Sequence, residues 1–334
     1  MDNVTHTLTA LLLSRAGLER LSPRATLCAV LAANAPDLDV VAGFAGQHAY
    51  LDAHRGWTHG LPLAPLVALV PVLLAGLIRR PTGFRWLGAW LASAAGLASH
   101  LLLDWTNIYG IRLLAPVSNE WFRLDITAVV DLWILALLGF AAAWPALARL
   151  VASEIGARGT SHGAGLARFA LVCLLAYEGA RYFTHARAVA MLESRVYDNE
   201  APRTAVALPD FANPFTWTGL VELDSAWRVI PVSLPRDFDP AAGHVFHRQP
   251  ASPAMAAAAR TAAFQALGRF SRTVHWQSVP ADEPEGAYDV TAVDLRFALP
   301  GEGRFTASAR VDANARVLES GFRFAPGGAM PRPR

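Results

Sequence analysis

The sequence predicts a mainly α membrane protein: a polytopic helical bundle followed by a C-terminal extracytoplasmic α+β domain. Three observations predict this fold class. The 334 residues are 53% hydrophobic and only 17% charged, whereas ordinary soluble domains carry about 25% charged residues. Long apolar runs with few charges fill the chain up to residue 183. Beyond residue 200, alternating apolar and polar residues with Pro and Gly replace these runs.

Four apolar segments are long enough to cross a bilayer, which requires about 20 helical residues. They are residues 61–78, 84–103, 126–148 and 166–183. The fourth is the weakest, because Glu178 and Arg181 lie at its end. The shorter stretches 4–13 and 25–35 are predicted to form a helical hairpin or half-spans packed against the others.

These segments predict three parts. Residues 1–150 form a membrane-embedded helical domain, residues 151–195 an additional transmembrane helix and linker, and residues 196–334 a soluble α+β domain. Nine arginines lie in the linkers on one predicted side and three in the loops on the other. Because cytoplasmic loops are rich in arginine, we expect loops 36–60 and 104–125 and the C-terminal domain to be extracytoplasmic.

The C-terminal domain is predicted from alternation and turn signals. The expected strands are "TWTGLVEL", "WRVIPVSL", "YDVTAVDLRFAL", "RFTASARVD" and "RVLESGFRF". The last three predict a meander joined by "PGEG" and "DANA" turns. "SPAMAAAARTAAFQALGRF" predicts one helix capped by its serine. His244 and His247 are expected to be surface or packing residues, since no catalytic constellation surrounds them.

Ionisable residues recur near the ends of the apolar runs, where polar groups are costly and favour a functional hypothesis. They occur in "THTLTA", "NAPDLD", "HRGWTH", "SHLLLDWTN" and "WFRLDITAVVD". His100 and Asp104 are four residues apart and share a helix face. His54 and His59 are five apart and cannot share one, so "HRGWTH" is predicted as a loop leading into a helix.

The residue types predict a metal centre. The predicted metal ligands are His6, Asp37, Asp39, His54, His59, His100 and Asp104. Imidazole and carboxylate together suit a divalent ion, zinc first, with manganese or iron as alternatives. Seven groups are enough for one or two ions, and a pair of ions activates water and clamps a phosphoryl or acyl oxygen.

Three further residues are predicted to be catalytic. Arg55 is always charged and is expected to stabilise developing negative charge. Asp125 and Asp131 are predicted to support the reaction, with one aspartate that binds no metal acting as general base. Each group also has a structural alternative. His6 would lie at the membrane interface, Asp125 and Asp131 would cap or pair with arginine, and the others would form turns or hydrogen-bonded pairs.

The motifs carry a family resemblance. "MDNVTHTLTA", "NAPDLD", "HRGWTH", "SHLLLDWTNIYG" and "WFRLDITAVVDLW", in this order, resemble the YdjM/YbcI family of predicted bacterial membrane-bound metal-dependent hydrolases. The resemblance covers roughly residues 1–140. It implies hydrolase activity and a multi-pass protein of the bacterial inner membrane. It does not explain the C-terminal domain.

The predicted function is hydrolysis of an ester or phosphoester by metal-activated water. A site at the membrane interface favours an amphiphilic substrate, such as a phospholipid or another lipid-linked ester. The expected partners are therefore membrane lipid and a small-molecule or lipid-linked substrate. The formal net charge of +2 gives no indication of nucleic-acid binding.

Two other functions use the same residues. A divalent-ion transporter would place its ligands along a path through the bilayer, whereas these cluster on one predicted side. A non-catalytic membrane scaffold would hold a structural metal in a closed site, and loss of a ligand would then cost folding.

Overall fold

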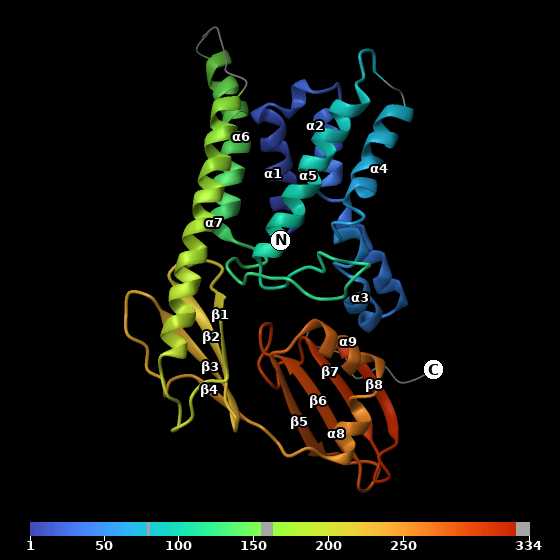
Figure 1. Ribbon diagram of the computed structural model, residues 1–334, viewed down its shortest axis with the longest axis vertical. Helices are drawn as coiled ribbons and strands as arrows, with labels where there is room; N and C mark the ends of the chain where they lie inside the picture. The colour runs from blue at the N-terminus through green and yellow to red at the C-terminus, as the bar shows by residue number, and fades with distance from the viewer. Residues whose placement is uncertain (79–80, 155–162, 325–334) are drawn as a thin grey trace. The chain divides into compact units, whose positions relative to one another are not determined.

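The computed structural model describes residues 1–78, 81–154 and 163–324 (Figure 1). Its contacts divide the chain into two compact units. The first comprises Met1–Leu38, Arg55–Ala186 and Pro209–Thr216, and the second comprises Asp39–His54, Arg187–Leu208 and Trp217–Arg334. The predicted domain boundary at residue 150 falls within the long helix Leu132–Glu154, and the one at residue 195 falls just after the helix Ala164–Glu193.

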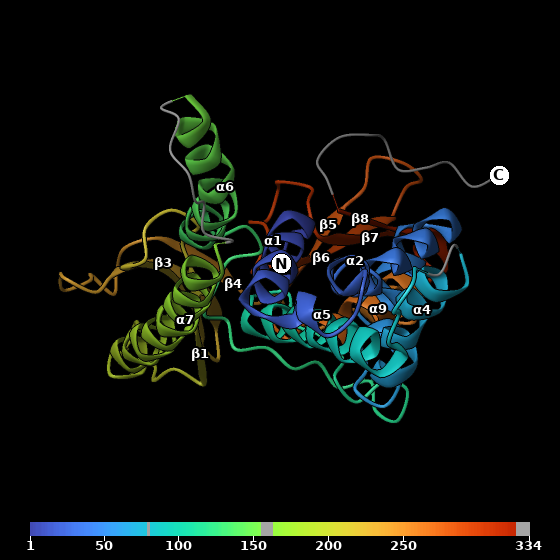
Figure 2. The same ribbon diagram turned by 90° about the horizontal axis from the view of Figure 1, so that it is seen from above.

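The N-terminal part is helical. Its elements are α1 (Asn3–Ala16), η1 (Leu18–Arg20), α2 (Ala25–Ala32), η2 (Pro36–Ala45), α3 (Gln47–Ala53), η3 (Trp57–His59), α4 (Ala64–Leu77), α5 (Trp86–Thr106), α6 (Leu132–Glu154) and α7 (Ala164–Glu193). Helices η1, η2 and η3 are of the 3-10 type. Figure 2 shows α1, α2, α4 and α5 clustered together, with α6 beside α7.

Two of the described helices, α5 and α6, are long and apolar enough to cross a membrane. Two bent pairs raise the number to four if each is one span: α2 with η2, bent by 41°, and α3–η3 with α4, bent by 81°. The helical region therefore has two to four candidate membrane spans. This agrees with the predicted helical bundle, and the predicted spans 84–103 and 126–148 correspond to α5 and α6.

Two predicted spans differ from the helices that form. Residues 61–78 yield α4, which has only 14 residues because the chain turns sharply before Ala64. Residues 166–183 lie in α7, which continues to Glu193 and is not among the candidate spans. Its charged residues, including Glu178 and Arg181, interrupt the apolar run.

Helix α5 is the centre of the helical unit because small residues let its neighbours approach. A Cβ atom at Gly96 would overlap the backbone carbonyl of Ala29 on α2, so only glycine allows this crossing. Ser93 on α5 donates to the carbonyl oxygen of Ala68 on α4 at 2.6 Å. On another side, Leu103 joins an apolar core with residues of α1, α6 and α7.

A long loop, residues 107–131, follows α5 and folds back on itself. The backbones of Ile111 and Phe122 exchange two hydrogen bonds, which form an isolated antiparallel bridge. The Arg112 amide donates to the carbonyl oxygen of Arg55 at 3.1 Å. The loop thereby fixes the backbone of the "HRGWTH" segment.

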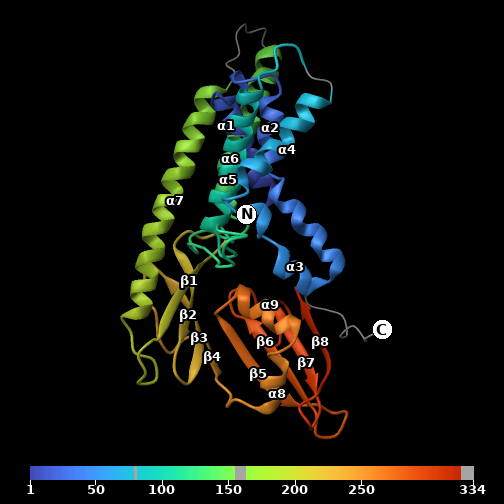
Figure 3. The same ribbon diagram turned by 45° about the vertical axis from the view of Figure 1, so that its right-hand side comes forward.

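The second unit contains two four-stranded sheets (Figure 3). The strands are β1 (Thr204–Pro209), β2 (Thr216–Glu222), β3 (Ala226–Ser233), β4 (His244–His247), β5 (Val274–Pro280), β6 (Tyr288–Asp294), β7 (Thr306–Val311) and β8 (Val317–Arg323). Each sheet follows chain order, and the pairs β3–β4, β5–β6, β6–β7 and β7–β8 are antiparallel.

The predicted strands form, including the meander β6–β7–β8. Sequence alternation missed β1, β4 and β5. His244 and His247 are exposed at the two ends of β4. The single helix predicted after residue 251 is wrong, since α8 (Pro253–Ala258) and α9 (Ala262–Phe270) are separated by a turn. The serine cap is correct, because Ser252 accepts a hydrogen bond from the Met255 amide.

Candidate metal centre

Four side chains with metal-ligand atoms converge beside α5. His100 and Asp104 come from α5 itself, His59 from η3 and Asp37 from η2. One ligand atom from each lies within 4.8 Å of the other three. All four belong to the first unit of the chain. We call these four residues the metal-ligand group.

The distances within the metal-ligand group are short. His59 Nε2 lies 3.1 Å from His100 Nε2 and 3.7 Å from Asp37 Oδ1. Asp104 Oδ2 lies 3.5 Å from the Nε2 atoms of both His59 and His100. The side chains of His59, His100 and Asp104 are completely buried, and that of Asp37 is 14% exposed. Any access to the group is therefore on the Asp37 side.

Local structure explains how the four side chains meet. The spacing of His100 and Asp104 puts both on one face of α5. Helix α2 ends at Ala32, and Pro36 begins η2, which carries Asp37. Arg55 has a left-handed backbone conformation with φ of 54°. This reversal redirects the chain after α3, so that η3 presents His59 to α5.

The protonation of His100 is fixed by its partner. Its Nδ1 atom lies 2.7 Å from the carbonyl oxygen of Ala33. A carbonyl oxygen only accepts hydrogen bonds, so Nδ1 carries the proton. The lone pair of Nε2 then faces the metal-ligand group. Metal-ligating histidines are held in this way by a hydrogen bond from the other ring nitrogen.

His6 adds a fifth donor to the group. Its ring stacks on His100 with centroids 3.9 Å apart, and its Nε2 lies 3.4 Å from Asp104 Oδ1. A neutral imidazole at this position offers one lone pair to a cation, as a metal ligand must.

Several buried atoms of the site lack a hydrogen-bond partner among the described residues. They are both ring nitrogens of His6, Oδ2 of Asp37 and Oδ2 of Asp104. Leaving a buried polar atom unsatisfied costs about 1–3 kcal/mol. A divalent cation would accept lone pairs from the two carboxylate oxygens and from one ring nitrogen of His6, because the other nitrogen of a neutral imidazole carries the proton. The residues present therefore fit a metal ion.

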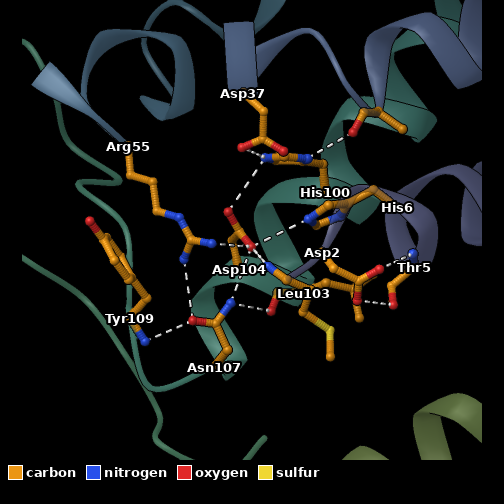
Figure 4. Close-up of polar contacts among 12 residues, drawn as sticks. Asp2, Thr5, His6, Asp37, Arg55, His100, Leu103, Asp104, Asn107 and Tyr109 are labelled. Atoms are coloured by element: carbon orange, nitrogen blue, oxygen red, sulfur yellow. Dashed lines mark hydrogen bonds and ion pairs between the residues drawn. The ribbon is translucent and has the colours of Figure 1, made fainter. Parts of the chain in front are cut away.

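Arg55 and Asn107 support Asp104 from the other side. Figure 4 shows Asp104 between Arg55 on one side and His6 and His100 on the other. Arg55 Nη2 lies 3.1 Å from Asp104 Oδ1, and Arg55 Nη1 donates to Asn107 Oδ1 at 3.2 Å. Asn107 Nδ2 donates to Asp104 Oδ1 at 3.1 Å. The amino group of Met1 also contacts Asp104 Oδ1.

Asn107 was not selected from the sequence. It is completely buried and follows Asp104 by three residues, a spacing that puts the two on the same side of a helix. That spacing within "DWTN" was a usable signal. Asn107 is the C-cap residue of α5 and therefore lies just beyond the last helical residue.

Two other predicted ligands bind each other. Asp39 Oδ1 lies 2.6 Å from His54 Nδ1, and the His54 ring stacks on Tyr50 with centroids 4.6 Å apart. Both belong to the second unit of the chain and are not members of the metal-ligand group. Their role as ligands stays a prediction.

The two aspartates predicted as catalytic make structural contacts. Asp125 pairs with Arg123 at 2.9 Å. Asp131 Oδ1 accepts hydrogen bonds from backbone amides at the start of α6, including that of Ile134, and both carboxylate oxygens accept from the Tyr177 hydroxyl. These are the capping and pairing contacts of the structural alternative. The catalytic role of both residues stays a prediction.

Apolar helices around a buried group of histidines and aspartates define a membrane protein with a candidate metal centre. The chain matches the model of the YdjM inner membrane protein family over residues 1–188. This is more than half of its length, so the chain belongs to that family. The matched residues include the whole metal-ligand group and His6, and they end within α7.

A more distant similarity covers part of the chain. This chain is 28% identical over 144 residues to the uncharacterised protein YfhP of Bacillus subtilis strain 168. The alignment covers 40% of this chain and 43% of the relative, so the chain spans less than half of that protein. No solved structure matches this chain.

Proposed function

We propose that this protein is a membrane-bound metal-dependent hydrolase that cleaves an ester or phosphoester. The observation that carries the proposal is the convergence of the metal-ligand group, with His6 and several unsatisfied buried lone pairs. A divalent ion held there, zinc before manganese or iron, supplies Lewis acidity and makes a water molecule more acidic.

The residues around the ion have separate tasks. His59, His100, Asp37 and Asp104 hold the cation, and His6 completes the donor set. The Ala33 carbonyl oxygen keeps the His100 ring turned toward the cation. Arg55 already contacts Asp104, and its permanent charge stabilises negative charge that develops on the substrate.

The substrate is an amphiphile, such as a phospholipid or another lipid-linked ester. Support comes from the position of the group beside α5, a candidate membrane span, and from its only partial exposure at Asp37. The arginine distribution further supports a multi-pass protein of the bacterial inner membrane, with the site and the C-terminal domain extracytoplasmic.

A scaffold with a structural metal is the second candidate. The complete burial of His59, His100 and Asp104 favours it, because structural metals occupy closed sites. Transport of a divalent ion receives less support, since the metal-ligand group is compact and does not extend along α5.

The first test measures metal content per chain in detergent-purified protein. Wild type is expected to hold about one or two equivalents of zinc, manganese or iron. His59→Ala and Asp104→Ala should lose the metal, and His247→Ala, which removes an exposed histidine, should keep it. Circular dichroism shows whether each variant is folded. Metal-free wild type after metal supplementation would contradict the proposal.

The second test assays the metal-loaded protein against soluble and lipid-linked esters and phosphoesters. Hydrolysis that disappears in folded His59→Ala supports the enzyme. Ligand variants that lose their fold along with the metal support the scaffold.

A further inference from the structure

An apolar groove lies between α4 and α5, outside the metal centre. Its volume is about 410 Å³, within the range of small-molecule sites. The lining includes Leu61, Ala64, Ala98, Leu101 and Trp105, and among the described residues no charged side chain lines it. The groove is open on one side and apolar along its walls, so it suits a hydrocarbon ligand.

The groove and the metal-ligand group share a wall. Leu101 follows His100, and Trp105 follows Asp104. Consecutive residues of a helix are about 100° apart, so the groove face of α5 adjoins the face that carries the ligands. At the other side, Leu61 lies two residues after His59. A molecule lying in the groove is therefore one helix face away from the metal centre.

The surroundings of the groove identify its occupant. Helix α5 is a candidate membrane span, and the chain belongs to an inner membrane protein family. Hydrocarbon chains of lipids are thus the medium that the open side of the groove contacts. An uncharged, apolar lining matches an acyl chain and offers nothing to an ion or a polar solute.

We propose that the groove binds an acyl chain of a membrane lipid whose head group reaches the metal centre through the partly exposed Asp37, which lies 3.7 Å from His59. The inference rests on the proposed hydrolase and narrows its substrate to a lipid ester with a long acyl chain. Soluble esters that lack such a chain would reach the same ligands without gaining this contact.

The test fills the groove without touching a metal ligand. Ala98→Phe adds a ring at an exposed position of the lining. The matched control, Ala143→Phe, adds the same ring at an exposed position of α6 outside the groove. Metal content should be unchanged in both variants, which shows that the centre is intact.

Labelling of the groove is measured in nanodiscs of phosphatidylethanolamine and phosphatidylglycerol. The probe is phosphatidic acid with a diazirine in the middle of one acyl chain. We expect labelled peptides to come mainly from residues 61–65 and 94–105, with labelling lost in Ala98→Phe and kept in Ala143→Phe. Even labelling of α5 and α6, or labelling unaffected by Ala98→Phe, would overturn the inference.

Kinetics separate this inference from the hydrolase itself. Ala98→Phe should raise KM for a long-chain lipid ester about tenfold, the scale of discrimination in apolar pockets. KM for the short-chain counterpart should not change. Equal effects on the KM of both substrates would contradict acyl-chain binding in the groove, while the proposed hydrolase activity would stand. Absence of any hydrolysis would contradict the hydrolase, and the labelling result would still decide the groove.

Discussion

Asn107 links the charged residues of the site to the loop that follows α5. Its side chain donates to Asp104 Oδ1, accepts from Arg55 Nη1 and accepts from the Tyr109 backbone amide at 2.8 Å. One buried amide thus holds a predicted ligand and a predicted catalytic arginine in a fixed relation. Residues that orient metal ligands in this way affect metal affinity although they do not touch the ion.

Replacing Asn107 with Ala should weaken metal binding by about 10–100-fold, the usual cost of removing a group that orients a ligand. Competition with a chelator measures the affinity. Asn119→Ala is the matched control, because Asn119 is exposed and accepts a hydrogen bond from Arg112 at 3.4 Å. Equal affinities of Asn107→Ala and wild type would show that Asp104 is held without the amide.

At the scale of helices, the crossing of α2 and α5 sets the geometry of the metal centre. Gly96 lies one turn before His100, where α5 runs against the carbonyl oxygen of Ala29. The same approach brings the Ala33 carbonyl oxygen to His100 Nδ1. Close packing of two helices is therefore also what orients a ligand.

Gly96→Ala should destabilise the protein by about 1–3 kcal/mol, because the added methyl group meets backbone atoms and the helices must move apart. Thermal unfolding in detergent measures this change, and metal affinity should fall with it. In Gly139→Ala, on α6, the added methyl group meets no described atom within 4 Å outside the backbone of its own helix, so stability should not fall. A wild-type melting temperature in Gly96→Ala would refute the packing argument.

Over the whole molecule, each unit has its own apolar core. Leu12, Leu103 and Leu138 belong to the core of the helical unit. Trp217 and Ile230 belong to a core of the second unit. The family match ends at residue 188, so it covers the first core and leaves both sheets outside. The two units can therefore respond separately to substitution.

A buried ion pair in the second unit can be used to test whether the two units respond separately to substitution. Asp294 and Arg296 pair at 2.7 Å with both side chains fully buried, and the Arg296 guanidinium lies over the Phe270 ring. Asp294→Asn should cost about 3 kcal/mol or more, because it removes the carboxylate charge from a buried ion pair. Hydrogen exchange should accelerate in β5–β8, while metal content stays at the wild-type level.

Glu302→Gln removes one partner of an exposed pair with Arg304. Such a pair contributes at most about 1 kcal/mol, so its exchange rates should match wild type. Loss of metal in folded Asp294→Asn would contradict the independence of the two units.

Sequence reasoning was strongest where a repeat is local. Periodicity located α5 and the meander β6–β8, and the serine cap located the start of α8. Prediction from the sequence failed where the residues show no periodic pattern. The alanine-rich segment around residue 258 gives no sign of the turn between α8 and α9, and the short strand β4 contains no buried residue.

Some contacts of the candidate site could likewise be predicted from local spacing, and others could not. His100 and Asp104 could be paired from sequence, because the helix itself fixes the geometry of residues four apart. Asp39 and His54 have the same chemistry as Asp37 and His59, and their motifs gave no reason to separate them. Only the fold shows that Asp39 and His54 bind each other while Asp37 joins the metal-ligand group.

The sequence by itself determined the apolar helices, the strands with clear alternation and the set of residues able to bind a metal, because each depends on neighbours along the chain. The tertiary structure alone decided which of those residues meet. His59 is brought to His100 by the left-handed turn at Arg55, and Asp37 by the close crossing of α2 and α5. Contacts between distant residues depend on packing and backbone direction, and a local pattern contains neither.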